Sequence, residues 1–198
     1  EDTGDIGNEY MYRQPDGEAP LTTEGLSADI RLVKHTPLAA VYRIEHVWNL
    51  PLGADALLDE EIRSMVPFRY RKSRRVGETA GVKIVTELTL SKDCRSVGIR
   101  SMIDNTVKDH RIRMLFKTGL ATAHVMADSI YEVARRPIQP EAAWSNPSNA
   151  QHQNAFISLS DGQAGLTVAN QGLNEYEVLP VHNTMAVTLV RGVRELGD

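Results

Sequence analysis

Alternation of apolar and polar residues with a period of two runs through most of this 198-residue chain. Such alternation is typical of half-buried β-strands, because successive side chains of a strand point to opposite faces of its sheet. Helical periodicity is almost absent, and the one candidate, 53–65, is either a helix or a loop before a strand. Strands are predicted at 27–36, 37–51, 82–91, 95–107, 110–119, 127–138, 155–162, 164–172, 175–180 and 185–193.

This run of strands predicts an all-β fold, a large antiparallel β-sandwich, in a single domain over residues 1–198. A chain of this length buries about 70% of its unfolded surface, so a sizeable core is available. Segments 82–91 and 95–107 flank a short polar turn and predict a hairpin. Segment 139–154 is rich in Asn, Gln, Ser and Pro, and we expect it on the surface with Trp144 at a rim or an interface.

Segment 37–51 indicates which side of one strand meets the core. Tyr42, Ile44, His46 and Trp48 alternate with a set that contains Arg43 and is more polar, so we expect the first set to face inward. A histidine beside a core tryptophan is more often a structural group than a ligand. We therefore predict that His46 is buried and hydrogen-bonded.

Charge and cysteine content exclude several classes of protein. The net charge of −4 is spread along the chain, which argues against a nucleic-acid-binding protein. The basic run 69–75 predicts a solvated strand end or loop, with binding of an anionic group as the alternative. Cys94 is the single cysteine, so no internal disulfide forms, and we interpret it as an incidental thiol. No membrane span or targeting segment is visible, and we expect a cytoplasmic protein.

No motif of a self-contained active site is present. The six histidines form no zinc-binding spacing, and the chain has no GxSxG, Walker A or GxGxxG sequence. His110 follows an aspartate at the start of a strand, which suggests bonding within a local turn. Carboxylates at Asp5, Glu9, Glu175 and Glu177 could pair for glycoside chemistry, but their separation is not given by the sequence. We therefore predict no catalytic residue and no metal ligand in this chain.

The chain opens with DTGDIGNEYMY (2–12), a polar loop with three acids and two tyrosines. No helix cap or initiator methionine precedes it. We expect that the chain is cut from a larger protein, and that this loop belongs to a site whose other half lies elsewhere.

Five stretches resemble one enzyme family in the order expected for it. Together they are similar to the C-terminal β-domain of glycoside hydrolase family 38, the zinc-dependent α-mannosidases, whose bacterial members include mannosylglycerate hydrolases. The stretches are DTGDIGNEYMYRQP (2–15), IDNTVKDHRIRMLFKTG (103–119), YEVARRP (131–137), GLTVANQGLNEYEVL (165–179) and MAVTLVRGVRELGD (185–198). The first departs from the commoner YDY pattern by Met11, and it has Gln14 before Pro15.

The resemblance implies a division of labour within a larger enzyme. In that family the zinc ligands and the aspartate nucleophile belong to an N-terminal α/β domain, and further β-structure follows the C-terminal end of this segment. This chain would be the non-catalytic, supersandwich-type β-domain of a retaining α-mannosidase or α-mannosylglycerate hydrolase, and inactive alone. Zinc would be bound only in the missing catalytic domain. A face covered in the whole enzyme by the catalytic domain and the missing tail would be exposed here and apolar; it would invite self-association into a homo-oligomer, and such a dimer would not establish the native oligomeric state.

The resemblance also implies which residues reach the sugar. Tyr10 matches a tyrosine that contacts the sugar in family members, and Asp5 is a plausible companion. Asn170, Gln171 and Glu175 lie in a second loop that would approach the same pocket. A tyrosine offers a flat apolar face and a hydroxyl to a pyranose, and carboxylates accept hydrogen bonds from sugar hydroxyls.

Structural roles are the alternative for these residues. Asp5 and Asn8 would then cap turns, Tyr12 would pack under the loop, and Glu175 and Tyr176 would be ordinary strand residues.

Two other functions remain open on the sequence. One is a free-standing carbohydrate-binding sandwich, which requires an exposed aromatic platform. The other is a mutarotase-type sugar epimerase, which uses a His and a Glu; His110 or His182 with Glu175 are the available pairs.

Overall fold

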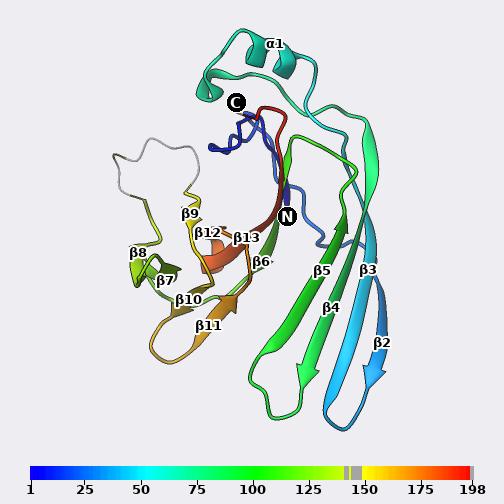
Figure 1. Cartoon of the computed structure of the whole chain (residues 1–198), viewed down its shortest axis with the longest axis vertical. Coiled ribbons are helices and arrows are strands. Elements are labelled where there is room, and N and C mark those ends of the chain that lie inside the picture. The colour runs from blue at the N-terminus through cyan, green and yellow to red at the C-terminus, as the bar shows by residue number, and fades with distance from the viewer. Residues whose placement is uncertain (141–142, 144–148, 197–198) are drawn as a thin grey trace.

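In the computed structural model, which describes residues 1–140, 143 and 149–196, the chain is almost wholly antiparallel β-structure (Figure 1). This confirms the predicted all-β antiparallel sandwich. The described strands are β1 (Asp2–Gly4), β2 (Asp29–His35), β3 (Ala39–Pro51), β4 (Thr79–Ser91), β5 (Val97–Asp104), β6 (His110–Phe116), β7 (His124–Ser129), β8 (Glu132–Pro137), β9 (Gln151–His152), β10 (Phe156–Ser160), β11 (Gly165–Ala169), β12 (Glu175–Leu179) and β13 (Thr184–Gly192).

The described strands form three sheets. The first has the order β1-β6-β13-β12-β9, the second β11-β10-β7-β8, and the third β2-β3-β4-β5. Apolar side chains from the first two sheets share one core, which includes Ile157, Tyr176 and Met185. A second core joins the third sheet, through Trp48, to Ile112 of the first. Short helical segments are α1 (Leu57–Arg63), which settles the helix-or-loop alternative for 53–65, and the 3₁₀ turns η1 (Phe68–Tyr70) and η2 (Val181–Asn183).

The third sheet has one apolar and one polar face, as the alternation predicts. The cross-strand register places Leu32, Tyr42, Leu88 and Ile99 side by side on one face. The opposite face carries ion pairs between Arg43 and Glu87 (2.8 Å) and between Lys83 and Glu45 (3.1 Å).

Only one end of the apolar face is covered. Trp48 and Val82 are buried there, as expected for the core side of 37–51. Toward the far hairpin ends, which extend away from the other sheets in Figure 1, large apolar side chains are exposed, and Tyr42 is among them, contrary to the expectation that it faces the core. We call this surface the open apolar face; it consists of Ile30, Leu32, Tyr42, Leu90, Val97 and Ile99.

Two local predictions were wrong. Segment 127–138 is a hairpin of β7 and β8, not a single strand. In its turn Tyr131 has a left-handed backbone conformation (φ 62°). This conformation is uncommon for a tyrosine, so the sequence does not indicate a turn there. The opening loop also contains β1, which pairs with β6.

The two histidines with predicted structural roles differ from expectation in their contacts. His46 is only partly buried, and its Nε2 makes no hydrogen bond within the described part of the chain; burial lowers the pKa of its imidazole. His110 is fully buried, and its ring makes one local and one long-range contact: Nε2 lies 3.1 Å from Oδ1 of Asn105 in the connection before β6, and Nδ1 lies 2.7 Å from Asp2 Oδ1.

The basic run 69–75 is not simply solvated. Arg71 and Ser73 are buried. Lys72, which lies between them, and Arg69 are exposed. The Arg75 side chain is also buried and forms ion pairs with Asp2 and Glu18. Two of the five cations of this run, Arg71 and Arg75, therefore serve as internal counter-ions.

Cys94 is exposed, as an incidental thiol would be. No helix among the described residues is long and apolar enough to cross a membrane. Trp144 lies outside the described residues.

Candidate functional site

One face of the first sheet is polar although much of it is buried. On β12, Tyr176 and Val178 point into the core, while Glu175 and Glu177 point to the opposite face. That opposite face meets the opening loop of the chain. The Arg111 guanidinium of β6 lies 3.4 Å from the centroid of the Tyr12 ring in the loop.

A β-bulge in β13 brings two polar residues of this strand to the same face. Thr188 pairs with Arg113 and Arg191 with Arg111, and the register shifts between Thr188 and Val190. Residues three apart in a regular strand point to opposite faces, so the extra residue places Thr188 and Arg191 on one side.

The loop between Ile6 and Arg13 is a tight, hydrogen-bonded structure. The Ile6 N–H donates to the Arg13 carbonyl (2.8 Å), and the Asn8 N–H donates to the Met11 carbonyl (3.0 Å). Asn8 Oδ1 accepts from the backbone N–H groups of Tyr10 (3.1 Å) and Met11 (2.8 Å). The turn that carries Tyr10 is therefore held in one conformation, and Asn8 has the capping role considered for it.

The Asp5 carboxylate stabilises this loop through hydrogen bonds at its base. Its side chain is buried, and Oδ1 accepts from the N–H groups of Gly7 (3.0 Å) and Arg13 (3.1 Å), while Oδ2 accepts from Arg191 Nε (2.8 Å). Burial raises the pKa of the Asp5 carboxyl, and the charge of Arg191 opposes that rise. Asp5 is not among the residues that line the cavity described next.

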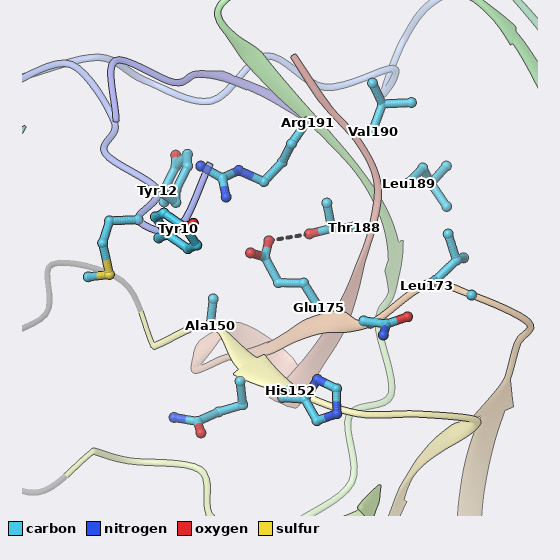
Figure 2. A pocket seen from close by; sticks show the side chains of 14 residues that line it. Tyr10, Tyr12, Ala150, His152, Leu173, Glu175, Thr188, Leu189, Val190 and Arg191 are labelled. Atoms are coloured by element: carbon cyan, nitrogen blue, oxygen red, sulfur yellow. Dashed lines mark hydrogen bonds between the residues drawn. The ribbon is translucent and has the colours of Figure 1, made fainter. Parts of the chain in front are cut away.

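Tyr10 and Glu175, two of the residues predicted from the sequence, line one open cavity of about 440 Å³ (Figure 2). Its volume lies within the range of about 300–1,000 Å³ that is typical of small-molecule sites. The Tyr10 side chain is 80% exposed and stands on one side, with Leu173 and Leu189 on the other. The other lining residues are Met11, Tyr12, Ala150, Gln151, His152, Gly172, Asn174, Thr188, Val190 and Arg191.

Glu175 is fixed from beneath the cavity. Its Oε1 accepts hydrogen bonds from Thr188 Oγ1 (2.5 Å) and from Arg111 Nη1 (3.2 Å). The side chain is 27% exposed, so the carboxylate is anchored on one side and open to a ligand on the other. Glu175 was predicted through the family resemblance, but the supporting Thr188 and Arg111 were missed, because only the three-dimensional register brings them together.

The other two predicted residues lie beside the cavity rather than in its lining. Asn170 Oδ1 accepts from the Leu173 N–H (2.9 Å), so Asn170 stabilises the turn over residues 170–173. Gly172 and Leu173 of this turn line the cavity. Gln171 is exposed on the same turn and is not a lining residue.

Tyr12 is buried under the loop, as the structural alternative predicted. Its hydroxyl donates to Thr3 Oγ1 (2.9 Å), and burial raises the pKa of the phenol, opposed by the charge of Arg111. Tyr12 also borders a second hollow of about 790 Å³, which none of the five predicted residues lines. His182 lines that hollow whereas Glu175 lines the first, and His110 is fully buried, so the pairs considered for an epimerase do not form one site.

The described lining of the cavity can contact a polyhydroxylated ligand through ring stacking and hydrogen bonds. The cavity offers an aromatic ring, a carboxylate and apolar walls. Within residues 1–140, 143 and 149–196, no three His, Cys, Asp or Glu side chains gather in a way that could hold a metal ion.

Comparison with known proteins gives a family match over nearly the whole chain. Residues 1–195 match the model described as "Glycosyl hydrolases family 38 C-terminal domain". A protein of Halalkalibacterium halodurans named "Putative mannosylglycerate hydrolase" is 42% identical over 198 residues, which are 100% of this chain and 22% of that protein.

Solved structures agree with the family match. An α-mannosidase from Enterococcus faecalis V583 superposes with a TM-score of 0.96 at 45% identity, over 100% of this chain and 22% of its own. A family 38 glycosyl hydrolase protein from Enterococcus faecalis superposes with a TM-score of 0.91 at 44% identity, over 100% of this chain and 23% of its own. The chain thus spans about a fifth of the length of these relatives.

Proposed function

Since the chain belongs to the family of C-terminal domains of family 38 glycosyl hydrolases, we propose that it is the non-catalytic β-domain of a retaining α-mannosidase or α-mannosylglycerate hydrolase. In this proposal the opening loop and β12 supply part of the wall of the sugar pocket. The rest of the pocket, and the groups that cleave the glycosidic bond, lie in polypeptide outside this chain.

One observation carries the pocket assignment. Tyr10 projects from a rigid turn toward a cavity in which the anchored carboxylate of Glu175 faces it (Figure 2). Tyrosine and carboxylate at opposite sides of a cavity suit a sugar, which has apolar C–H faces and hydroxyl donors on its rim. We propose that Tyr10 and Glu175 contact the mannose, and that Asp5 acts by holding the loop.

Zinc has no donor set in the part of the chain that the structure describes. We therefore propose that zinc binds in the catalytic domain of the full-length polypeptide, and we assign no step of the reaction to it here. The retaining mechanism, in which two carboxyl groups about 5 Å apart act as nucleophile and acid–base, is likewise assigned to that domain. The isolated chain should hydrolyse no aryl α-mannoside.

Replacing Tyr10 with alanine should lower kcat/KM for an aryl α-mannoside about 30-fold in the full-length polypeptide. Loss of the ring contact and of one hydrogen bond is worth about 2 kcal/mol, which corresponds to that factor. Tyr131→Ala is the matched control, because Tyr131 is fully exposed on the β7–β8 turn and does not line the cavity, and it should leave kcat/KM unchanged. Equal activity of the Tyr10→Ala variant and the parent enzyme would contradict the pocket assignment.

We further propose that polypeptide of the same protein, outside this chain, covers the open apolar face. Monomeric proteins rarely leave a contiguous apolar surface of this kind exposed. The relatives contain more than three-quarters of their length beyond the aligned region, which provides a covering partner in the same chain.

Ile30 and Val47 test that proposal as a matched pair. Both side chains are 62% exposed here, but Ile30 lies on the open apolar face and Val47 on the polar face. Ile30→Asp should destabilise the full-length protein by about 2 kcal/mol, because a carboxylate would be buried, and Val47→Asp should have little effect. The isolated chain should self-associate in sedimentation experiments, and Ile30→Asp should weaken that association. Equal effects of the two substitutions would refute the proposal.

Titration of the isolated chain with α-mannosides distinguishes a free-standing carbohydrate-binding domain from the non-catalytic β-domain proposed here. If the isolated chain binds α-mannosides with millimolar or better affinity, the site is sufficient alone; under our proposal no such binding is measured.

A further inference from the structure

We propose that Arg191 is a positioning residue that fixes Tyr10 over the cavity, an inference that rests on the sugar-pocket function proposed above. Arg191 borders the cavity, but its Nε, Nη1 and Nη2 each donate to the opening loop, so its proposed role is to position that loop rather than to bind the sugar. Its effect would be transmitted through the backbone of the opening loop, whose carbonyl groups it binds immediately before Tyr10.

The contacts of Arg191 join three points of the loop. Its Nε donates to Asp5 Oδ2 (2.8 Å), Nη2 donates to the Asn8 carbonyl (2.8 Å), and Nη1 donates to the Glu9 carbonyl (3.3 Å). The side chain is 17% exposed, so water competes little with these bonds. The guanidinium therefore uses its planar set of donors to define both the base of the loop and the two peptides that lead into Tyr10.

A second arginine binds the preceding two peptides. Nη1 of Arg71 donates to the carbonyls of Ile6 (2.8 Å) and Gly7 (2.9 Å), and Arg71 is buried. Four consecutive carbonyl groups, from residue 6 to residue 9, thus accept hydrogen bonds from two guanidinium groups. A backbone held at each of four successive peptides has little freedom to move the side chain that follows.

Strand β13 connects this clamp to the opposite wall of the cavity. Thr188 of β13 donates to Glu175, and Arg191 of the same strand holds the loop of Tyr10. The β-bulge between them turns both side chains to the cavity side. The two proposed sugar contacts are therefore positioned relative to each other through one short stretch of strand.

Four variants of the full-length polypeptide test the proposal, with aryl α-mannoside hydrolysis and hydrogen exchange of the peptide covering residues 6–13 as readouts. Arg191→Gln should lower kcat/KM about 10-fold and accelerate exchange in that peptide. Arg191→Lys should lose less, because an ammonium can still pair with Asp5 but cannot donate in the same fork. Combining Arg191→Gln with Tyr10→Ala should give about the 30-fold loss of Tyr10→Ala alone, since Arg191 acts through Tyr10.

Arg194→Gln is the matched control. Arg194 also pairs with a buried carboxylate, Asp109, and donates to a backbone carbonyl, that of Ala54 (3.1 Å), but it does not bind the loop. Its substitution should lower the free energy of unfolding, because Asp109 loses its buried counter-ion, but should leave exchange in residues 6–13 and kcat/KM nearly unchanged.

Two results would overturn the proposal. One is unaltered exchange of residues 6–13 in Arg191→Gln. The other is a multiplicative loss of about 300-fold in the double variant, which would mean that Arg191 acts independently of Tyr10. A failure of the pocket function looks different: Tyr10→Ala would retain full activity while Arg191→Gln still accelerated loop exchange.

Discussion

Gly7→Ala should lower α-mannoside hydrolysis by the full-length polypeptide about 100-fold, the largest effect expected of any substitution in the opening loop. A Cβ atom at Gly7 would lie 1.8 Å from the Met11 carbonyl oxygen and 3.0 Å from the Arg13 backbone nitrogen. Those atoms accept and donate the hydrogen bonds that close the loop, so the turn cannot form around a methyl group. Tyr10, Met11 and Tyr12 would all be displaced from the cavity wall, and a misplacement of about 1 Å can cost about 100-fold in rate.

Gly77→Ala is the control for this change. No atom lies within 4 Å of the position that its Cβ would occupy, so the variant should keep its activity. Circular dichroism should show an intact β-fold in both variants, because Gly7 lies in a loop outside the sheets. Full activity of Gly7→Ala would show that the loop conformation has no bearing on hydrolysis.

Asp109→Ala should destabilise the fold by about 3 kcal/mol. Asp109 is fully buried, and its Oδ2 accepts from the Ala54 N–H (2.9 Å) and from Arg194. Its removal leaves a buried N–H without an acceptor and takes the buried counter-ion from Arg194. Urea unfolding monitored by circular dichroism measures the change.

Asp59→Ala separates burial from charge pairing. Asp59 binds the same guanidinium, at 2.8 Å from Arg194 Nη1, but its side chain is 53% exposed. An exposed ion pair contributes less than about 1 kcal/mol, so this variant should unfold at nearly the parent urea concentration. Similar losses for both aspartates would contradict the role assigned to burial.

The sheets could be predicted from the sequence because the period-two pattern is local. Trp48 is buried where the alternation places it, and the hairpin of β4 and β5 forms as expected. The pattern did not predict the turn at Tyr131. The surrounding hairpin, rather than the conformational preference of tyrosine, places this residue in the left-handed region.

The charged groups were less predictable, because their partners are distant in the sequence. Arg71 and Arg75 are indistinguishable from Arg69 and Arg74 in a basic run, and only the fold brings Asp2 and the opening loop to the first pair. Tyr10 was proposed through the family resemblance. The positioning role of Arg191 could not be predicted, because the loop residues that it binds, between 5 and 9, are more than 180 positions away in the sequence.

The bulge in β13 makes the cavity depend on the number of residues in that strand. Deleting Leu189 would restore regular pairing and rotate either Thr188 or Arg191 to the apolar side, so both walls could not be supported together. Homologous strands of the same composition but one residue shorter would therefore be expected to have lost this cavity. Counting residues between the threonine and the arginine would then distinguish relatives that kept the arrangement from those that did not.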